Sequence, residues 1–318
     1  MNNLKKIGLT ALAGSLVATS VAYAGELAVT GSAGMKMENS SNSSAGKTVG
    51  MDNNIYFKGS GETDGGLNIN LSYELDDGSD SGNASAVWDN HSVSVGNDAI
   101  GTLTVHGHGG SNSASALDTT AAGDLWDNGS LVPAANQPDA ARSENGLVVY
   151  SLPSVVDDLS VAVSFDSAGM DNEGSTAFGA SYTGVEGLSL SFGSGNDAST
   201  AGVSIDQTVM KASYAYGSFT VGASLSEYDH TTGTNDQEVR SYGVSYTLTD
   251  QISLSYGTET FERQGTTADV ELDGVSASYT SGGMTVGLTS IESKNADNTT
   301  DGVDNDNSYW KLSLGFAF

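Results

Sequence analysis

Hydrophobic and polar residues alternate along most of the chain. In residues 66–75 the large apolar side chains occupy every second position, from Leu67 to Leu75, and asparagine, serine and glutamate occupy the positions between them. A period of two places successive side chains on opposite faces of a β-strand. The same alternation recurs in 159–166, 218–228 and 238–248. The pattern therefore predicts a protein built almost entirely of strands.

Sixteen strands are predicted from this alternation and from the turn residues between the segments. They cover residues 26–37, 50–60, 66–75, 86–95, 101–107, 144–151, 159–166, 175–183, 187–193, 208–216, 218–228, 238–248, 251–261, 270–280, 284–293 and 307–318. Short connections such as 217–218 alternate with long connections rich in Asp, Asn, Ser and Gly, such as 294–306. Short turns on one side of a membrane and long loops on the other are typical of outer-membrane barrels.

The composition of the polar face indicates the class of β-protein. Its positions hold mainly Ser, Gly, Thr, Ala and Asn, whereas the outward face of a soluble sandwich carries many charged residues. Small polar side chains suit the water-filled interior of a closed sheet, and large apolar ones suit contact with lipid. A closed barrel also pairs every backbone group within the bilayer. The prediction is an all-β transmembrane antiparallel β-barrel of 16 strands.

Composition and charge exclude several classes of function. The 318 residues include 41 Gly, 3 Pro, 13 Tyr and no Cys, and the formal net charge is −28. Such a charge repels phosphate, so no nucleic-acid partner is expected. Without cysteine there is neither a disulfide framework nor a thiolate metal site.

The N-terminus predicts export from the cytoplasm. Lys5 and Lys6 precede an apolar stretch from Ile7 to Ala22, and Ala22-Tyr23-Ala24 stands just before Gly25. This order is typical of a cleaved signal peptide over residues 1–24, the alternative being an uncleaved membrane anchor. The mature barrel domain is then 25–318, and its formal charge becomes 9 − 39 = −30, since residues 1–24 hold two lysines and no acid.

One connection is much longer than the others. About 35 residues separate His106 from Arg142, and they include two of the three prolines. A compact fold rarely contains so long a connection unless it has a function of its own. It follows the fifth strand, so it is the loop of the third hairpin.

With its sixteen strands, long third loop and terminal phenylalanine, the chain resembles a general diffusion porin of Gram-negative outer membranes, of the α-proteobacterial type. The similar segments are DNHSVSVGNDAIGTLTV (89–105), ENGLVVYSLP (144–153) and YWKLSLGFAF (309–318). The resemblance implies a homotrimer, a third loop folded into the lumen, and recognition of Phe318 by the barrel-assembly machinery. The loop lacks the Pro-Glu-Phe-Gly stretch that many relatives carry.

Charged residues of the loop and of the small-residue face are the candidate pore groups. Asp118, Asp124 and Asp127 are expected either to line a constriction and attract cations or merely to be solvated and cap turns. Alternation places Lys36, Lys58, Lys211 and Lys311 on the lumenal face, with His106 and His108 beside the loop entrance and Arg142 at its exit. The histidines are interpreted as pore-lining groups that titrate near neutral pH, a metal pair or a structural role being the alternatives.

A second acidic group lies in the long connection before the last strand. Asp297, Asp301, Asp304 and Asp306 offer closely spaced carboxylates of the kind that Ca²⁺ prefers, although the spacing is not that of an EF-hand. A solvated acidic loop, or calcium bridging to lipopolysaccharide, fits the same residues.

The sequence thus predicts an outer-membrane porin for passive diffusion of small hydrophilic solutes and ions, with a preference for cations because acids greatly outnumber bases. No Gly-x-Ser-x-Gly or His-Glu-x-x-His motif is present, so no enzyme and no required cofactor is expected. The alternatives are a substrate-selective channel and a non-conducting structural or adhesive barrel.

Overall fold

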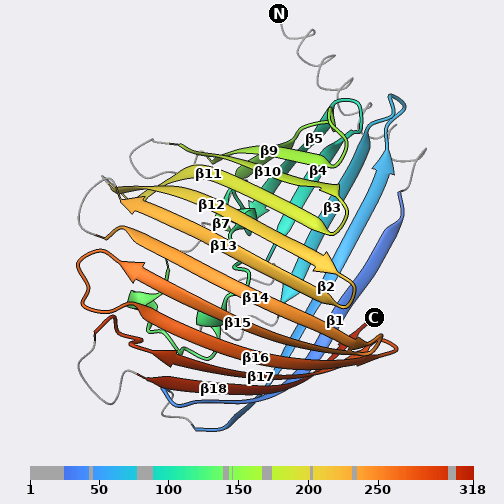
Figure 1. The fold of residues 1–318 in the computed structure, drawn as a ribbon. Coiled ribbons are helices and arrows are strands. Elements are labelled where there is room, and N and C mark those ends of the chain that lie inside the picture. Colours follow the sequence, from blue (N-terminus) through green and yellow to red (C-terminus); the bar gives the residue numbers. More distant parts are fainter. Residues whose placement is uncertain are drawn as a thin grey trace, which may run out of the picture.

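The computed structural model describes residues 25–42, 46–76, 89–138, 143–144, 146–166, 174–200, 203–230, 235–299 and 306–318. These residues form a closed barrel of sixteen strands, and each strand pairs antiparallel with its neighbours (Figure 1). The prediction of a 16-stranded antiparallel barrel is confirmed. No helix among the described residues is long and apolar enough to cross a bilayer.

The barrel strands agree closely with the predicted segments. They are β1 (Leu27–Ser40), β2 (Thr48–Glu62), β3 (Asn68–Asp76), β4 (His91–Asn97), β5 (Gly101–His108), β8 (Leu147–Ser151), β9 (Leu159–Asp166), β10 (Ser175–Val185), β11 (Leu188–Thr200), β12 (Val203–Tyr216), β13 (Phe219–His230), β14 (Gln237–Thr249), β15 (Ile252–Arg263), β16 (Val270–Ser281), β17 (Met284–Lys294) and β18 (Asn307–Ala317). The largest differences are in β11 and β12, which are longer than predicted at their loop-side ends. In β11 the added residues 194–200 are small or polar and show no apolar alternation. In β12 the apolar positions change face, because Ile205 packs against buried apolar residues on the inner side whereas Met210 is exposed on the outer side.

The first and last strands close the barrel. Ser32 lies opposite Ala317, and the pairing runs in register to Ser40 opposite Tyr309. The backbones of Gly31 and Phe318 exchange two hydrogen bonds of 2.9 and 3.0 Å. A side chain on Gly31 would meet the Phe318 ring at 2.9 Å, so the aromatic ring covers this glycine.

The two faces of the sheet differ as the alternation predicted. On the outer face Val221, Tyr242 and Val275 are 49%, 59% and 54% exposed, which suits contact with lipid. On the inner face hydroxyls pair across strands, Ser253 with Ser278 at 2.7 Å and Ser255 with Ser276 at 2.6 Å. Apolar side chains therefore surround the barrel, and small hydroxyl residues line much of its interior.

The connection between β5 and β8 folds into the lumen, as expected. It contains the short strands β6 (Gly110–Ser111) and β7 (Ser143–Glu144), which pair with each other, and the 3-10 turns η1 (Ser115–Leu117), η2 (Leu125–Asp127) and η3 (Ala134–Asn136). Figure 1 shows green and teal elements of this connection inside the barrel. The turn η1 contacts β11 and β12, and η2 contacts β15 and β16. The connection is called the inner loop below (residues 109–146).

Candidate functional site: the lumen and its inner loop

An apolar cluster holds the inner loop against one side of the barrel. Leu125, Leu131 and Val132 of the loop are 7%, 0% and 0% exposed. They belong to one cluster with seven buried residues of the wall, which are Tyr228, Val239, Phe261, Val270, Leu272, Ile291 and Tyr309. Burial of this surface favours the folded-in position of the loop. The hydrophobic core of the protein therefore lies between the loop and strands β13–β18.

Hydrogen bonds from five strands fix the backbone of the loop. Ser164 Oγ on β9 accepts from Ser113 N, Ser224 Oγ on β13 accepts from Ala121 N, and Ser241 Oγ on β14 accepts from Ala122 N, each at 2.9 Å. Lys211 Nζ on β12 donates to the Thr119 carbonyl at 2.6 Å. Asn307 Nδ2 on β18 donates to the Leu131 carbonyl at 2.9 Å. These bonds satisfy loop backbone groups that have no partner in a sheet.

Glu259 on β15 is a further anchor of the loop, with 0% of its surface exposed. One carboxylate oxygen accepts a hydrogen bond from the Thr120 hydroxyl, and the other accepts a hydrogen bond from Trp126 N at 3.2 Å. The Thr120 hydroxyl in turn accepts from Gly123 N and Asp124 N at 3.1 and 2.8 Å. A buried carboxylate is tolerated because several donors surround it. Glu259 thus organises the turn from Thr120 to Trp126.

The three predicted loop acids differ in their surroundings. Asp118 accepts from Gln207 Nε2 at 3.1 Å, and Asp124 accepts from Thr120 N at 2.9 Å. Asp127 is exposed. Burial raises the pKa of Asp118 to about 6, opposed by the Gln207 hydrogen bond and assisted by the charge of Asp124. Partial desolvation within the lumen, assisted by the charge of Asp124, also raises the pKa of Asp127.

The lysines predicted for the lumenal face lie on strands that surround the channel. Lys36 forms ion pairs with Asp52 at 3.1 Å and Glu38 at 3.8 Å. Lys58 lies 5.2 Å from the centre of the Tyr56 ring, beside a cavity of about 450 Å³ lined by lumenal side chains. Lys211 is the residue bound to the loop backbone, as described above. Lys311 lies opposite Glu38 across the β1–β18 ladder.

The two histidines of β5 point in different directions. His106 lies opposite Ser92 on the lumenal face, and a side chain on Gly110 would meet its ring at 2.7 Å. A register shift between His91 and Ser92 interrupts the alternation. The His108 ring consequently stacks on His91, which stacks on Tyr73 of the outer face. The prediction that His108 lines the lumen is wrong, because the bulge turns its side chain outward. Arg142 lies outside the described residues.

The wall formed by β1–β3 carries a second polar network. Asn54 Nδ2 and Asn90 Nδ2 donate to the two oxygens of Glu74 at 3.2 and 2.6 Å. The Tyr309 hydroxyl donates to Glu38 at 2.7 Å. With the Lys36–Asp52 pair, these groups form a wall of mixed charge whose acids outnumber its bases.

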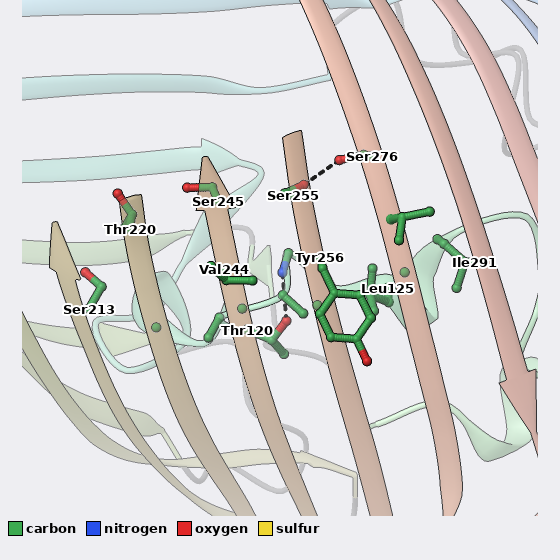
Figure 2. Close-up of a pocket in the computed structure, with 18 of the residues that line it drawn as sticks. Thr120, Leu125, Ser213, Thr220, Val244, Ser245, Ser255, Tyr256, Ser276 and Ile291 are labelled. Carbon is green, nitrogen blue, oxygen red and sulfur yellow. Dashed lines mark hydrogen bonds between the residues drawn. The ribbon is translucent and has the colours of Figure 1, made fainter. Parts of the chain in front are cut away.

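A cavity of about 330 Å³ lies between the turn Thr120–Leu125 and strands β12–β17. Figure 2 shows hydroxyl side chains around it, from Ser213 and Thr220 to Ser255 and Ser276. Its lining includes Lys211 and no carboxylate side chain. The lumen beneath the loop is thus a hydrophilic space with little fixed charge.

Sequence reasoning missed the residues that hold the loop. Glu259, Gln207, Ser224 and Ser241 occupy positions of the small-residue face, where the alternation gives no reason to single them out. A detectable signal was the row of bulky residues on that same face, such as Val239 and Phe261. Large apolar side chains facing a water-filled lumen require a covering segment.

Comparison with known proteins assigns the chain to a family. A family model described as Gram-negative porin matches residues 8–318. The chain belongs to the Gram-negative porin family. No curated protein matches the chain.

Solved porin structures share the fold of this porin at low sequence identity. The trimer form of OmpT, an outer membrane protein of Vibrio cholerae, has a TM-score of 0.70 at 16% identity, covering 93% of this chain and 100% of the other. An anion-selective porin from Comamonas acidovorans has a TM-score of 0.67 at 14% identity, covering 92% and 99%. A mutant of the Rh. blastica porin has a TM-score of 0.66 at 16% identity, covering 92% and 100%.

Family membership establishes the general role of this porin. It is an outer-membrane channel for diffusion in a Gram-negative cell, and porins are channels rather than enzymes. Porins require no cofactor. Among the described residues, no three His, Cys, Asp or Glu side chains are grouped so that they could hold a metal ion.

The predicted calcium residues are only partly described in this porin. Asp297 accepts from the backbone and hydroxyl of Thr299 at 3.1 and 2.9 Å, so it caps a turn of its own loop. Asp306 is an exposed residue immediately before β18. Asp301 and Asp304 lie outside the described residues. Calcium binding at this loop stays a prediction.

Proposed function

We propose that this porin is a cation-selective channel for small hydrophilic solutes and ions, narrowed by its inner loop. The observation that carries the proposal is the anchoring of the loop to one side of the lumen, through the apolar cluster and Glu259. A loop fixed against β9–β18 leaves the charged wall of β1–β3 as the opposite boundary of the channel. The fixed position favours an open, narrowed pore over a plugged barrel.

Charge supports the cation preference. Asp127 is exposed on the loop, and Glu38, Asp52 and Glu74 lie on the facing wall. Lys36 is paired with two of these acids, and Lys211 is bound to a loop carbonyl. Net negative potential in a constriction raises the local cation concentration. Asp118 and Asp124 contribute charge while they fasten the loop.

We also propose that the chain assembles as a homotrimer, by analogy with the trimer form of the Vibrio cholerae OmpT structure. The C-terminal strand, with Phe318 paired to Gly31, is proposed as the segment that the barrel-assembly machinery recognises. Residues 1–24 are proposed as a cleaved signal peptide, and the outer loops as contacts for lipopolysaccharide.

Planar-bilayer recording tests the channel. Purified protein is expected to insert with stepwise conductance, to close in three steps, and to give a cation-selective reversal potential across a KCl gradient. Anion selectivity would overturn the charge argument while leaving the channel intact. Folded, heat-modifiable protein without conductance would instead favour a structural or adhesive barrel.

A further inference from the structure

Six glycines of the lumenal wall form a row beneath the inner loop. They are Gly179 on β10, Gly193 on β11, Gly222 on β13, Gly243 on β14, Gly257 on β15 and Gly274 on β16. Gly179 lies directly opposite Gly193 in the β10–β11 ladder. The last four are also direct neighbours, since each pairs with the next across β13–β16. These six residues are called the glycine row.

The inner loop follows the glycine row in contact with it. A Cβ atom on Gly179 would lie 2.1 Å from the Ser113 carbonyl oxygen, and one on Gly243 would lie 2.1 Å from the Ala121 carbonyl oxygen. A Cβ on Gly257 would lie 2.5 Å from the Cβ of Ala122. The corresponding distances are 2.8 Å from Gly193 to Ala114 Cα and 2.5 Å from Gly274 to a methyl carbon of Leu125. All five are well below the ordinary contact distance of about 3.5–4.0 Å between carbon atoms.

Backbone conformation does not explain these glycines. None of the six has the positive φ that favours glycine. Glycine also destabilises a strand interior relative to alanine, so six of them in one band require a reason. A close approach by another part of the chain is such a reason, and it is observed at five of the six. At Gly222 a Cβ atom would be in ordinary contact with the Cβ of Ala121, at 3.4 Å.

We propose that the glycine row sets the distance between the inner loop and the wall and thereby determines the free width of the channel. The row allows the loop backbone to come within hydrogen-bonding reach of Ser224, Ser241 and Glu259. A methyl group in the row would shift the loop toward the open lumen by on the order of 1 Å. The inference rests on the proposed function, because width has consequences only in a conducting channel.

The test is an exchange of one methyl group between wall and loop. In Gly257→Ala the new methyl group meets Ala122, and in the double variant Gly257→Ala/Ala122→Gly the opposing methyl group is removed. Gly315→Ala is the matched control, because Gly315 also lies on the lumenal side of the sheet, in β18, and a Cβ there would have no atom within 4 Å. Single-channel conductance and the permeation rates of neutral sugars of increasing size are measured for each protein, after folding is checked by heat-modifiability.

Since the conductance of a narrow pore follows its free cross-section, Gly257→Ala is expected to lower conductance by roughly 1.2- to 1.5-fold and to slow the larger sugars most. Ala122→Gly in the same chain removes the 2.5 Å contact but leaves Ala122 Cα 2.9 Å from the new methyl group, so it is expected to restore most of both values. Gly315→Ala is expected to match the wild type. If Gly257→Ala fails to fold, recovery of folding in the double variant supports the same contact.

Two results would overturn the inference. One is a wild-type channel whose conductance is unchanged or raised by Gly257→Ala. The other is a decrease, or a folding defect, that Ala122→Gly does not reverse. A wild-type protein that folds but forms no channel would refute the proposed function instead, so the two failures are distinguishable.

Discussion

Removing the carboxylate of Glu259 should release the middle of the inner loop while leaving the barrel intact. In Glu259→Ala the Thr120 hydroxyl and the Trp126 amide lose their acceptor. A buried donor left without a partner costs about 1–3 kcal/mol, so two such donors set an upper range of about 2–6 kcal/mol. Water entering the vacated space would satisfy part of this need, which favours the lower half of the range.

The effect should be local. The sixteen strand pairings do not depend on Glu259, whereas the turn Thr120–Trp126 has this residue at its centre. Hydrogen exchange measures local opening directly. A loss of about 3 kcal/mol corresponds to exchange of loop amides faster by roughly 100-fold, because each 1.36 kcal/mol is tenfold. Amides of the barrel strands should exchange as in the wild type.

Two further variants sharpen the experiment. Glu259→Gln keeps one acceptor oxygen, so it should lie between the wild type and Glu259→Ala. Glu262→Gln removes a carboxylate from the exposed part of the same strand and should leave the loop unchanged. Loop amides in Glu259→Ala that exchange as slowly as in the wild type would refute the reasoning that this carboxylate holds the loop.

Three other predictions concern charge, pH and packing. Asp127→Asn should lower the cation-to-anion permeability ratio by roughly 2-fold, since an exposed charge acts through water. The control Asp98→Asn, in a short turn, should leave this ratio unchanged. Equal reversal potentials for the two variants would contradict the role of Asp127. Because the pKa of Asp118 is raised to about 6, this carboxyl is ionised at pH 7.5 and mostly protonated at pH 5, so cation preference should fall over that interval in the wild type and fall less in Asp118→Asn. Cation preference falls on acidification because burial favours the neutral form of Asp118 in the folded loop. A cation preference that rises as the pH falls would contradict this role of Asp118. Leu131→Ala, at a site with 0% exposure, should weaken docking of the loop by about 2–5 kcal/mol. The measurement is faster amide hydrogen exchange in residues 112–138. Protection equal to that of the wild type would show that the apolar cluster does not anchor the loop.

The strands could be predicted because the physical constraint on them is simple. Lipid on one side and water on the other impose a period of two, and this period is clear wherever both solvents are present, as in β9 (Leu159–Asp166) and β16 (Val270–Ser281). The prediction weakened at the loop-side end of β11, where the residues are small or polar. It also weakened at the loop-side end of β12, where apolar residues such as Ile205 lie on the inner face. It failed for His108 because a bulge adds one residue to the count, and alternation alone contains no sign of it.

The position of the loop could not be predicted in the same way. Carboxylates such as Asp118 and Asp124 can either face a channel or accept hydrogen bonds from the chain, and their sequence neighbours do not distinguish the two. The structure shows that both accept such bonds. The contact of Ser113 with Ser164, or of Thr120 with Glu259, joins residues far apart in sequence that no local pattern relates.

The sequence of the wall strands nevertheless indicates where the loop lies, although the sequence of the loop itself does not. Along the lumenal face of β15 the order is Ser253, Ser255, Gly257, Glu259 and Phe261. Strand β16 repeats this order in register, with Leu272 opposite Glu259 and Val270 opposite Phe261, and β14 has Val239 opposite Phe261. In β13 the hydroxyl and the glycine are in register, but Ser224 and Ser226 precede the first bulky residue, Tyr228. Hydroxyls suit open water, glycine suits a close backbone, and bulky apolar residues need a cover. Since the glycines pair directly across four neighbouring strands, and bulky apolar residues follow them at paired positions of β14, β15 and β16, the place where the loop crosses the wall is determined chiefly by the wall.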